Sequence, residues 1–223
     1  MTKNLNLSTW KYIGDEVLFF CKFSTLGDKF SSLLEDLFEV KENVKNSLIS
    51  KYKNKEIDIK VSVWVVPIFK NSHRNRTVSV KYDDESTRRD FLGQDMDIGF
   101  RISKYSNPNA IVMSISCASL FMYCNKEIGE KFKIVGVKKL KGVNNDAFYP
   151  IIWYSPNWQK LEIKSSDEFV SETYFDIAGS IDKLSHIIGL LKLKNDIEKL
   201  KNLKDRLRSQ KNIELLDRND DLK

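Results

Sequence analysis

A carboxylate and a guanidinium stand four residues apart at Asp97 and Arg101. This spacing puts both side chains on one face of a helix, and a planar guanidinium is well suited to binding the charged oxygens of a phosphate. A second carboxylate, Asp15, follows Gly14 in a predicted tight turn, where it could hold Mg²⁺ together with phosphate oxygens. Plainer interpretations stay open, because Asp–Arg pairs are common on helix surfaces and Gly-Asp pairs are common in turns.

The segments that must position these side chains alternate between strand and helix patterns. Residues 12–23 predict a β-hairpin, because apolar and aromatic residues flank the turn at Gly14 and Asp15. Apolar residues recur at three- and four-residue intervals over residues 30–52, after a possible cap at Asp28, which predicts a long amphipathic helix. The following segment alternates and is rich in β-branched side chains, which predicts a buried strand over residues 57–69.

The middle of the chain continues this alternation. We expect a helix in which Ile98, Ile102 and Tyr105 share one face, and Pro108 ends it. Short strands are predicted over residues 77–81 and 110–116, a helical turn over 117–124, and a pair of strands over 132–139 and 149–154 joined by a loop at 142–145. The interleaved pattern predicts an α/β (α+β) fold.

The pattern changes after Pro156. A Lys-rich helix is predicted there, with Leu184, Ile188 and Leu191 on one apolar stripe. We therefore expect a main domain over residues 1–160 and a helical extension over residues 161–223.

Composition excludes several classes of protein. The chain has 223 residues and a net charge of 37 − 31 = +6, which is too small to indicate a nucleic-acid partner by itself. No stretch approaches the ~20 apolar residues that span a bilayer, and the amino terminus lacks a secretory signal, so we expect a cytoplasmic protein without a membrane partner. His73 and His186 are too far apart in sequence to suggest a zinc site, and the three cysteines are expected to be reduced core thiols: Cys21, Cys117 and Cys124.

Three separated motifs follow one another along the chain. Residues 10–16 read Trp-Lys-Tyr-Ile-Gly-Asp-Glu, residues 90–101 read Asp-Phe-Leu-Gly-Gln-Asp-Met-Asp-Ile-Gly-Phe-Arg, and residues 139–143 read Lys-Leu-Lys-Gly-Val. In this order they resemble the Lys-x-x-Gly-Asp, Asp-x-x-Gly-x-x-x-Asn-x-x-x-Arg and Leu-Lys-Gly motifs of the class III nucleotidyl cyclases. The first two are more similar to the forms found in Pycsar-type pyrimidine cyclases of bacterial antiphage defence.

The resemblance implies a ferredoxin-like βαβ core and a reaction in which a nucleoside triphosphate attacks its own α-phosphorus through its 3′-hydroxyl. Asp15 would bind metal in a site for two Mg²⁺ or Mn²⁺ ions, and Arg101 would stabilise the transition state. Lys11 and Asp90 would read the base. Lys141 would bind the triphosphate, although Lys138 and Lys139 lie close enough to replace it. Asp97 stands where the family usually has Asn.

The resemblance specifies the reaction more closely than the base of the nucleotide substrate. The Pycsar-like motifs favour UTP as substrate and cyclic UMP, a second messenger for a downstream effector protein, as product. The Lys11 and Asp90 pair alone would imply adenine and an adenylate cyclase. A third possibility is an inactive nucleotide-binding or dimerisation domain. Relatives form head-to-tail homodimers with the site at the interface, so a homodimer is implied here.

The resemblance also predicts a gap. In the family, a strand with the first metal aspartate and two helices precede the Lys-x-x-Gly-Asp hairpin, whereas this chain reaches that hairpin at residue 11. We therefore expect an amino-terminally shortened domain that lacks one metal carboxylate. Asp95 or the acidic cluster at residues 83–85 (Asp83, Asp84 and Glu85) could replace that ligand.

Overall fold

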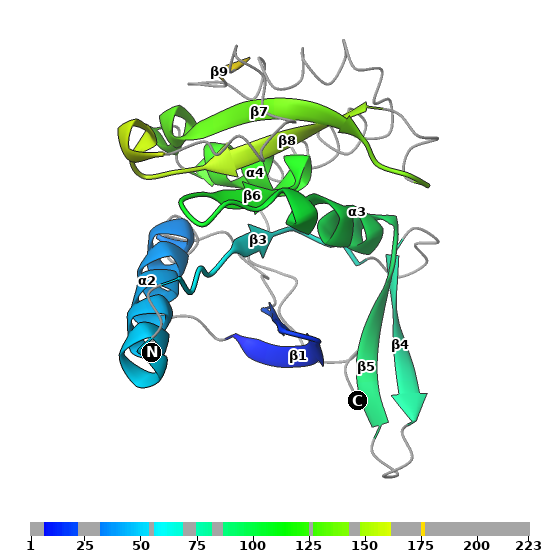
Figure 1. Cartoon of the computed structure of the whole chain (residues 1–223). Helices are drawn as coiled ribbons and strands as arrows, with labels where there is room; N and C mark the ends of the chain where they lie inside the picture. Colours follow the sequence, from blue (N-terminus) through cyan, green and yellow to red (C-terminus); the bar gives the residue numbers. More distant parts are fainter. Residues whose placement is uncertain are drawn as a thin grey trace.

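The computed structural model describes residues 7–21, 32–53, 56–68, 75–81, 87–124, 127–142, 148–161 and 175–176. Several predictions fall outside this part of the chain: the extension helix after Pro156, the cap at Asp28, and the acidic cluster at residues 83–85. The described part combines one larger sheet, two separate hairpins and helices, as Figure 1 shows. The predicted mixture of strands and helices is therefore confirmed.

The larger sheet has five strands in the order β3-β6-β8-β7-β9. β3 (Val61–Val63) runs parallel to β6 (Ile111–Met113), and β6 pairs antiparallel with β8 (Phe148–Tyr154). β8 pairs antiparallel with β7 (Phe132–Lys139), which also pairs antiparallel with the short strand β9 (Phe175–Asp176). The middle strands are buried, because β6 and β8 carry apolar side chains on both faces.

Three helices pack against this sheet and contribute side chains to its core. α2 (Leu33–Tyr52) follows Ser32, and α3 (Gln94–Ile102) continues into the 3₁₀ turn η1 (Ser103–Tyr105). α4 (Ile115–Cys124) leads through η2 (Glu127–Lys131) into β7, and η4 (Trp158–Lys160) follows β8. The largest side chains that are completely buried come from β8, α4 and β7: Trp153, Tyr149, Tyr154, Phe121 and Phe132.

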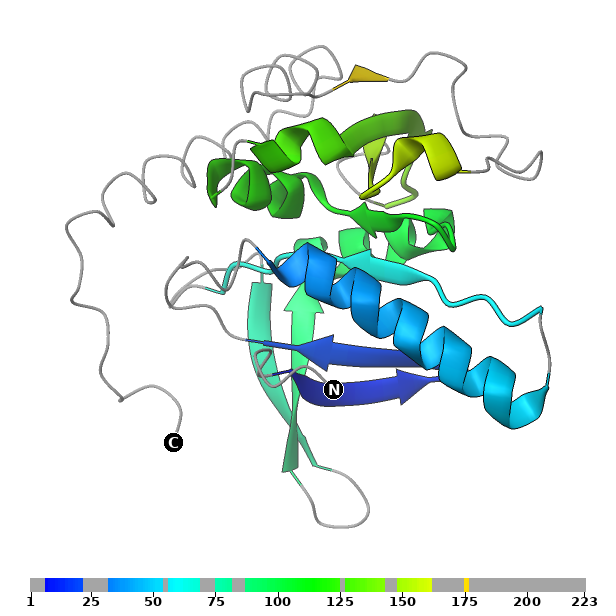
Figure 2. The ribbon, with the colours of Figure 1, turned by 90° about the vertical axis from the view of Figure 1, so that its left-hand side faces the viewer.

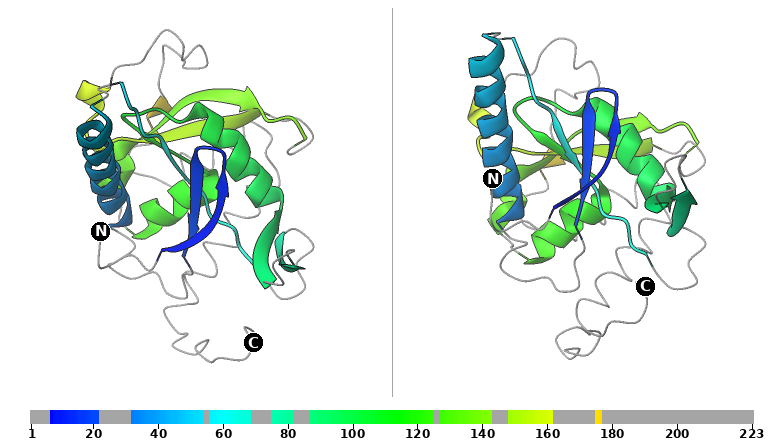
Figure 3. Two further views of the ribbon diagram at one scale, coloured as in Figure 1. Left: turned by 60° about the horizontal axis from the view of Figure 1, so that its bottom comes forward. Right: turned by 90° about the horizontal axis from the view of Figure 1, so that it is seen from below.

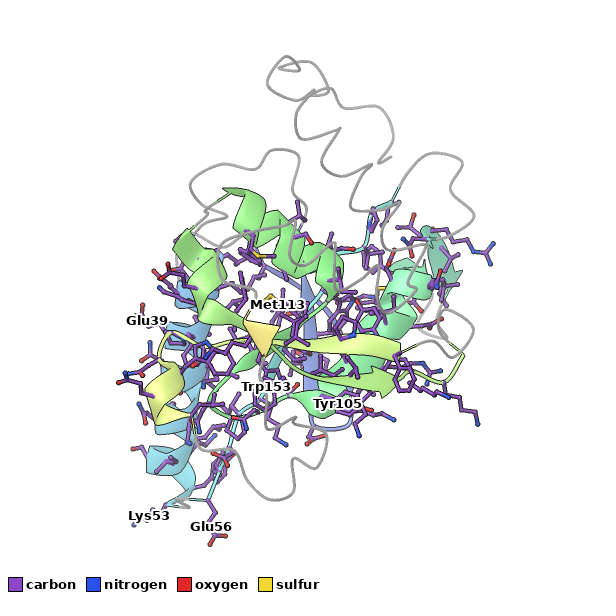
Figure 4. The ribbon with its side chains drawn as sticks, turned by 90° about the horizontal axis from the view of Figure 1, so that it is seen from above. Glu39, Lys53, Glu56, Tyr105, Met113 and Trp153 are labelled. Atoms are coloured by element: carbon purple, nitrogen blue, oxygen red, sulfur yellow. The ribbon has the colours of Figure 1, made fainter. Side chains whose placement is uncertain are left out.

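Side chains between the layers are anchored by polar contacts as well as by packing. The Trp153 indole donates a hydrogen bond to the carbonyl of Tyr105 over 2.8 Å, which ties β8 to the end of η1. This hydrogen bond holds the 3₁₀ turn that follows α3, the helix of Arg101, against the sheet. In Figure 4, Met113 and Trp153 lie near the middle of the molecule, whereas Glu39, Lys53 and Glu56 lie at its periphery.

Two hairpins lie outside the larger sheet. β1 (Ser8–Ile13) and β2 (Glu16–Phe20) are joined at Gly14 and Asp15, and Gly14 has the positive φ of 60° that such a turn requires. This hairpin lies between α2 and α3 when the molecule is seen from below (Figure 3), and α2 crosses obliquely in front of it in the view of Figure 2. β4 (Asn75–Lys81) and β5 (Thr87–Gly93) form the second hairpin, which projects away from the larger sheet (Figure 1).

The structure corrects several boundaries. The predicted strand at residues 57–69 is reduced to Val61–Val63, and it is only half-buried because it has one described neighbour, β6. The predicted strand at 110–116 ends at Met113 because α4 begins at Ile115, and the predicted helical turn is a ten-residue helix. β5 was not predicted. Within the described residues, no helix has the length and apolar character needed to cross a membrane.

Candidate functional site

The predicted base-reading pair is in direct contact. Lys11 on β1 donates a hydrogen bond to Asp90 on β5 over 2.9 Å, although 79 residues separate them in sequence. The side chains are 33% and 25% exposed, so the pair is partly shielded from water but accessible to a ligand. A pair of this kind presents a donor and an acceptor at one place, which is what recognition of a nucleobase edge needs.

Aromatic packing holds the two hairpins against each other at this pair. The Trp10 ring meets the Phe91 ring edge-on with centroids 5.1 Å apart, and the Phe20 ring lies 5.3 Å from the same Phe91 ring. Trp10 also lies 6.3 Å from Phe100 on α3. Because Trp10 precedes Lys11 and Phe91 follows Asp90, the apolar contact brings the two charged side chains together.

Among the described residues, the Asp90 carboxylate is only partly engaged in hydrogen bonds. Its Oδ1 atom accepts from Lys11 Nζ and from the amide of Phe91, the latter over 3.0 Å. Both of these hydrogen bonds use Oδ1, so within the described structure Oδ2 can accept from a ligand. Lys11 has further N–H donors besides the one given to Asp90.

Arg101 lies in the last turn of α3 beside the predicted phosphate-binding turn. A Cβ placed on Gly142 would lie 3.6 Å from an Nη atom of Arg101. Gly142 has φ +74°, a left-handed conformation that favours glycine. The structure therefore brings the last residue of one motif next to the Lys-Gly turn of another, 41 residues further along the chain.

The Arg101 guanidinium is not fully satisfied. Its Nε atom is buried and has no hydrogen-bond partner among the described residues. An unpaired buried N–H is unfavourable by roughly 1–3 kcal/mol, and more on a charged group. The surface ion pair with Asp97 that the spacing also allowed is not formed in the described structure.

The remaining predicted residues are exposed. Asp15 lies at the tip of the first hairpin, Asp97 lies in the first turn of α3, and Lys141 precedes Gly142. The structure thus brings Lys11 to Asp90 and Arg101 to Gly142, but no described hydrogen bond or ion pair joins Asp15 or Asp97 to either pair. Their predicted roles stay predictions.

Asp95, one of the predicted replacement ligands, has a different use in the structure. Asp95 is 4% exposed as a residue. Its carboxylate accepts from the Asn75 side chain over 2.7 Å, while its backbone amide donates to the same side chain over 3.2 Å. Asn75 also donates to the carbonyl of Pro67 over 3.0 Å. Asp95 therefore fastens the start of α3 to β4. Among the described residues, no three His, Cys, Asp or Glu side chains are grouped as a metal site.

Gly99 and Trp64 are residues whose roles the sequence did not reveal. A Cβ on Gly99 would lie 2.3 Å from the Trp64 ring, so only glycine lets the indole rest on α3. The ring also lies 5.6 Å from Phe100. The motif Gly-Phe-Arg was the available signal, but a glycine within a helical pattern does not show which side chain approaches it.

The described cysteines have the thiol chemistry of buried residues. Burial raises the pKa of Cys117, which is fully buried, and burial also raises the pKa of the half-buried Cys21. Both are free thiols, and a raised pKa keeps them protonated near neutral pH. The expectation of reduced core thiols is confirmed for Cys117 and partly for Cys21, whereas the Cys124 side chain lies outside the described part of the structure.

The site consists of a donor–acceptor pair between two hairpins and a cationic corner at the end of α3. Compared with protein-family models, curated proteins and solved structures, the chain matches none of them.

Proposed function

We propose that this protein is a nucleotidyl cyclase that converts a nucleoside triphosphate, in the first instance UTP, into a 3′,5′-cyclic nucleotide and pyrophosphate. One observation carries the proposal: Lys11 and Asp90, which the motif resemblance pairs in base recognition, are in contact over 2.9 Å. Local sequence pattern alone gives no reason for two residues so far apart to meet. The contact is therefore independent support for combining the first two motifs into one site.

The pair can read the edge of a pyrimidine. Uracil presents an N–H at N3 beside a carbonyl oxygen, so N3–H would donate to Asp90 Oδ2 and the carbonyl would accept from Lys11. Cytosine presents an amino group beside N3 and fits the same two partners. Adenine also offers an amino group beside a ring nitrogen, which favours an adenylate cyclase as the second candidate. The Pycsar-like form of the motifs places UTP first.

Lys141 would hold the triphosphate, and Arg101 would stabilise the transition state. When the 3′-hydroxyl attacks the α-phosphorus, the P–O bond to pyrophosphate breaks, and negative charge accumulates on the phosphorus oxygens and on the leaving group. The Arg101 guanidinium, whose Nη atom lies beside Gly142, would stabilise that charge. The exposed Lys141 side chain, next to Gly142, would neutralise the pyrophosphate. Asp97 would orient the ribose or a phosphate through hydrogen bonds.

Asp15 is the carboxylate proposed to hold Mg²⁺ or Mn²⁺. It fits this role in part, because its side chain is exposed at a turn and magnesium is often held by one or two carboxylates with phosphate oxygens completing the shell. A bound metal pair would supply activation of the hydroxyl and neutralisation of phosphate charge. The single carboxylate is also the observation that keeps an inactive nucleotide-binding domain as an alternative.

Part of the sheet supports the finer description of the fold. β3 and β6 are parallel neighbours, and the chain between them passes through the β4–β5 hairpin and then α3, while β7 and β8 add an antiparallel pair. We therefore propose a ferredoxin-like cyclase core. The motif resemblance adds the proposal of a head-to-tail homodimer, and we propose that the protein works in the cytoplasm. Its cyclic product would be read by a separate effector protein.

Product analysis tests this proposal. The 223-residue protein is incubated with each of ATP, GTP, CTP and UTP and Mn²⁺, and the products are separated. We expect cyclic UMP as the main product and a changed base preference in Asp90→Asn. Asp58→Asn is the matched control, because it breaks another Lys–Asp pair, with Lys45 at 2.8 Å. Cyclic AMP as main product would favour the second candidate, and binding without any cyclic product would favour the inactive domain.

A further inference from the structure

β1 contains one extra residue opposite β2. Thr9 pairs with Phe19 and Lys11 pairs with Leu18, so the register of the ladder shifts by one residue at Trp10. This is a β-bulge. Neighbouring side chains in a regular strand point to opposite faces, whereas a bulge re-aims one of them. The bulge therefore allows Trp10 and Lys11, which are adjacent in sequence, to turn towards the same place.

The two side chains are in contact at that place. Lys11 Nζ lies 4.0 Å from the centre of the Trp10 ring, and the same atom lies 2.9 Å from Asp90 Oδ1. The ammonium group is thus held between the negative face of an indole and a carboxylate. Tryptophan is the strongest of the aromatic side chains in this type of contact.

The Trp10 ring is itself fixed. Its edge-on contact with Phe91 and its contact with Phe100 attach it to both β5 and α3. A lysine side chain is long and flexible. If it becomes ordered only when a ligand binds, the lost conformational entropy lowers the affinity for that ligand. A lysine that is already held presents its remaining N–H donors in a defined direction.

We propose that Trp10, placed by the bulge, is a positioning residue that fixes Lys11 against Asp90 and thereby determines how sharply the site distinguishes one base from another. This inference rests on the proposed function, because it assigns Trp10 to the same site. Trp10 acts through Lys11 and takes no part in the reaction itself.

The test replaces Trp10 with tryptophans that carry one to four fluorine atoms, incorporated at position 10 only. Fluorine withdraws electron density from the ring face while the ring keeps its shape, so packing on Phe91 is retained. The measured quantity is base selectivity, the ratio of dissociation constants for the preferred and the next-best nucleoside triphosphate. We expect this ratio to fall stepwise, by roughly 3- to 30-fold over the series. A merely structural role would change Tm and leave the ratio unchanged.

Trp158 offers the matched control. Lys133 Nζ lies 5.0 Å from its ring, and the same fluorinated series there should leave base selectivity unchanged. Trp10→Phe keeps an aromatic ring and should retain more selectivity than Trp10→Leu. Constant selectivity across the position-10 series, in folded protein that does discriminate between bases, overturns the inference and leaves the proposed function intact. A wild-type protein that binds all four nucleotides equally, or none, overturns both.

Discussion

Gly99 on α3 and Trp64, which directly follows β3, are so close that a Cβ on Gly99 would lie 2.3 Å from the indole ring. Such a distance is far inside van der Waals contact, so the helix and the indole fit together only because residue 99 has no side chain. α3 also carries Asp97 and Arg101. The position of two proposed site residues therefore depends on this contact.

Gly99→Ala should destabilise the protein. Within a helix this change usually stabilises by roughly 0.5–1 kcal/mol, but forcing a methyl group into the Trp64 ring is expected to cost about 1–3 kcal/mol. The steric term is larger, so we expect a net loss of about 1–2 kcal/mol in the free energy of unfolding in urea. Trp64→Leu made in the same chain should recover part of that loss. Strictly additive effects of the two changes would show that the two residues do not compete for space.

Arg101→Ala should depress kcat by on the order of 10²-fold with little change in nucleotide affinity, because a guanidinium at the phosphate binds the transition state more strongly than the ground state. Arg101→Lys keeps the charge but loses the planar fork, so it too should lose much of its activity. Steady-state kinetics measure both changes. Arg76→Ala, at an exposed position on β4, is the control. Wild-type kinetics for Arg101→Ala would remove this residue from the mechanism.

Asp15→Asn should lower turnover far more than stability. Asparagine suits the turn after Gly14, so the hairpin should form, but an anionic metal ligand is lost. The assay compares the rate and the Mn²⁺ concentration dependence of the variant with those of Glu16→Gln, the exposed neighbouring carboxylate. We expect Glu16→Gln to resemble the wild type. Equal rates for Asp15→Asn and the wild type in Mn²⁺ would exclude Asp15 as a ligand.

Much of the fold could be predicted because its signals are local. The turn at Gly14 and Asp15, the periodicity of α2 and the apolar strands β7 and β8 all lie within short windows of sequence. β5 was missed because Arg88, Arg89 and Asp90 interrupt any apolar alternation, and its ladder with β4 is what makes it a strand.

The candidate site depends on contacts that local patterns do not contain. The Lys11 and Asp90 contact could be expected only by comparing motifs, because its residues lie on different hairpins. The bulge at Trp10 and the approach of Gly99 to Trp64 had no sequence signal of their own, since both arise from the way separate elements pack. The buried use of Asp95 was likewise hidden, because a carboxylate beside a helix start resembles a free ligand until its partner, Asn75, is located.

Tyr154 gives a prediction about pH. Its hydroxyl is buried without a hydrogen-bond partner among the described residues, and burial, with a smaller effect of Glu35, raises its pKa from 10.0 to about 12. The folded state therefore holds this hydroxyl proton more tightly than the unfolded state. The contribution of Tyr154 to the free energy of unfolding is fully present below pH 10 and is lost as the pH rises towards 12. Tyr154→Phe should reduce that alkaline loss, as measured by urea unfolding at several pH values.

The same substitution should be neutral or stabilising near pH 7, because it removes an unsatisfied buried hydroxyl. Tyr149→Phe is the matched control. Its hydroxyl accepts from the amide of Ile115 over 3.1 Å, so removing it orphans a buried N–H and should cost roughly 1–3 kcal/mol. A Tyr154→Phe protein as destabilised as Tyr149→Phe would mean that the Tyr154 hydroxyl has a partner.

Phosphorus NMR of one reaction mixture tests the central claim, cyclisation at the site of Lys11, Asp90 and Arg101, most directly. The protein is mixed with Mg²⁺ and UTP, and the resonances of the triphosphate, the cyclic phosphodiester and pyrophosphate are followed together. We predict that cyclic UMP and pyrophosphate appear in equal amounts, and that Arg101→Ala slows both by on the order of 10²-fold. Release of inorganic phosphate with UDP, or an unchanged spectrum for UTP, CTP, ATP and GTP in turn, would contradict the claim.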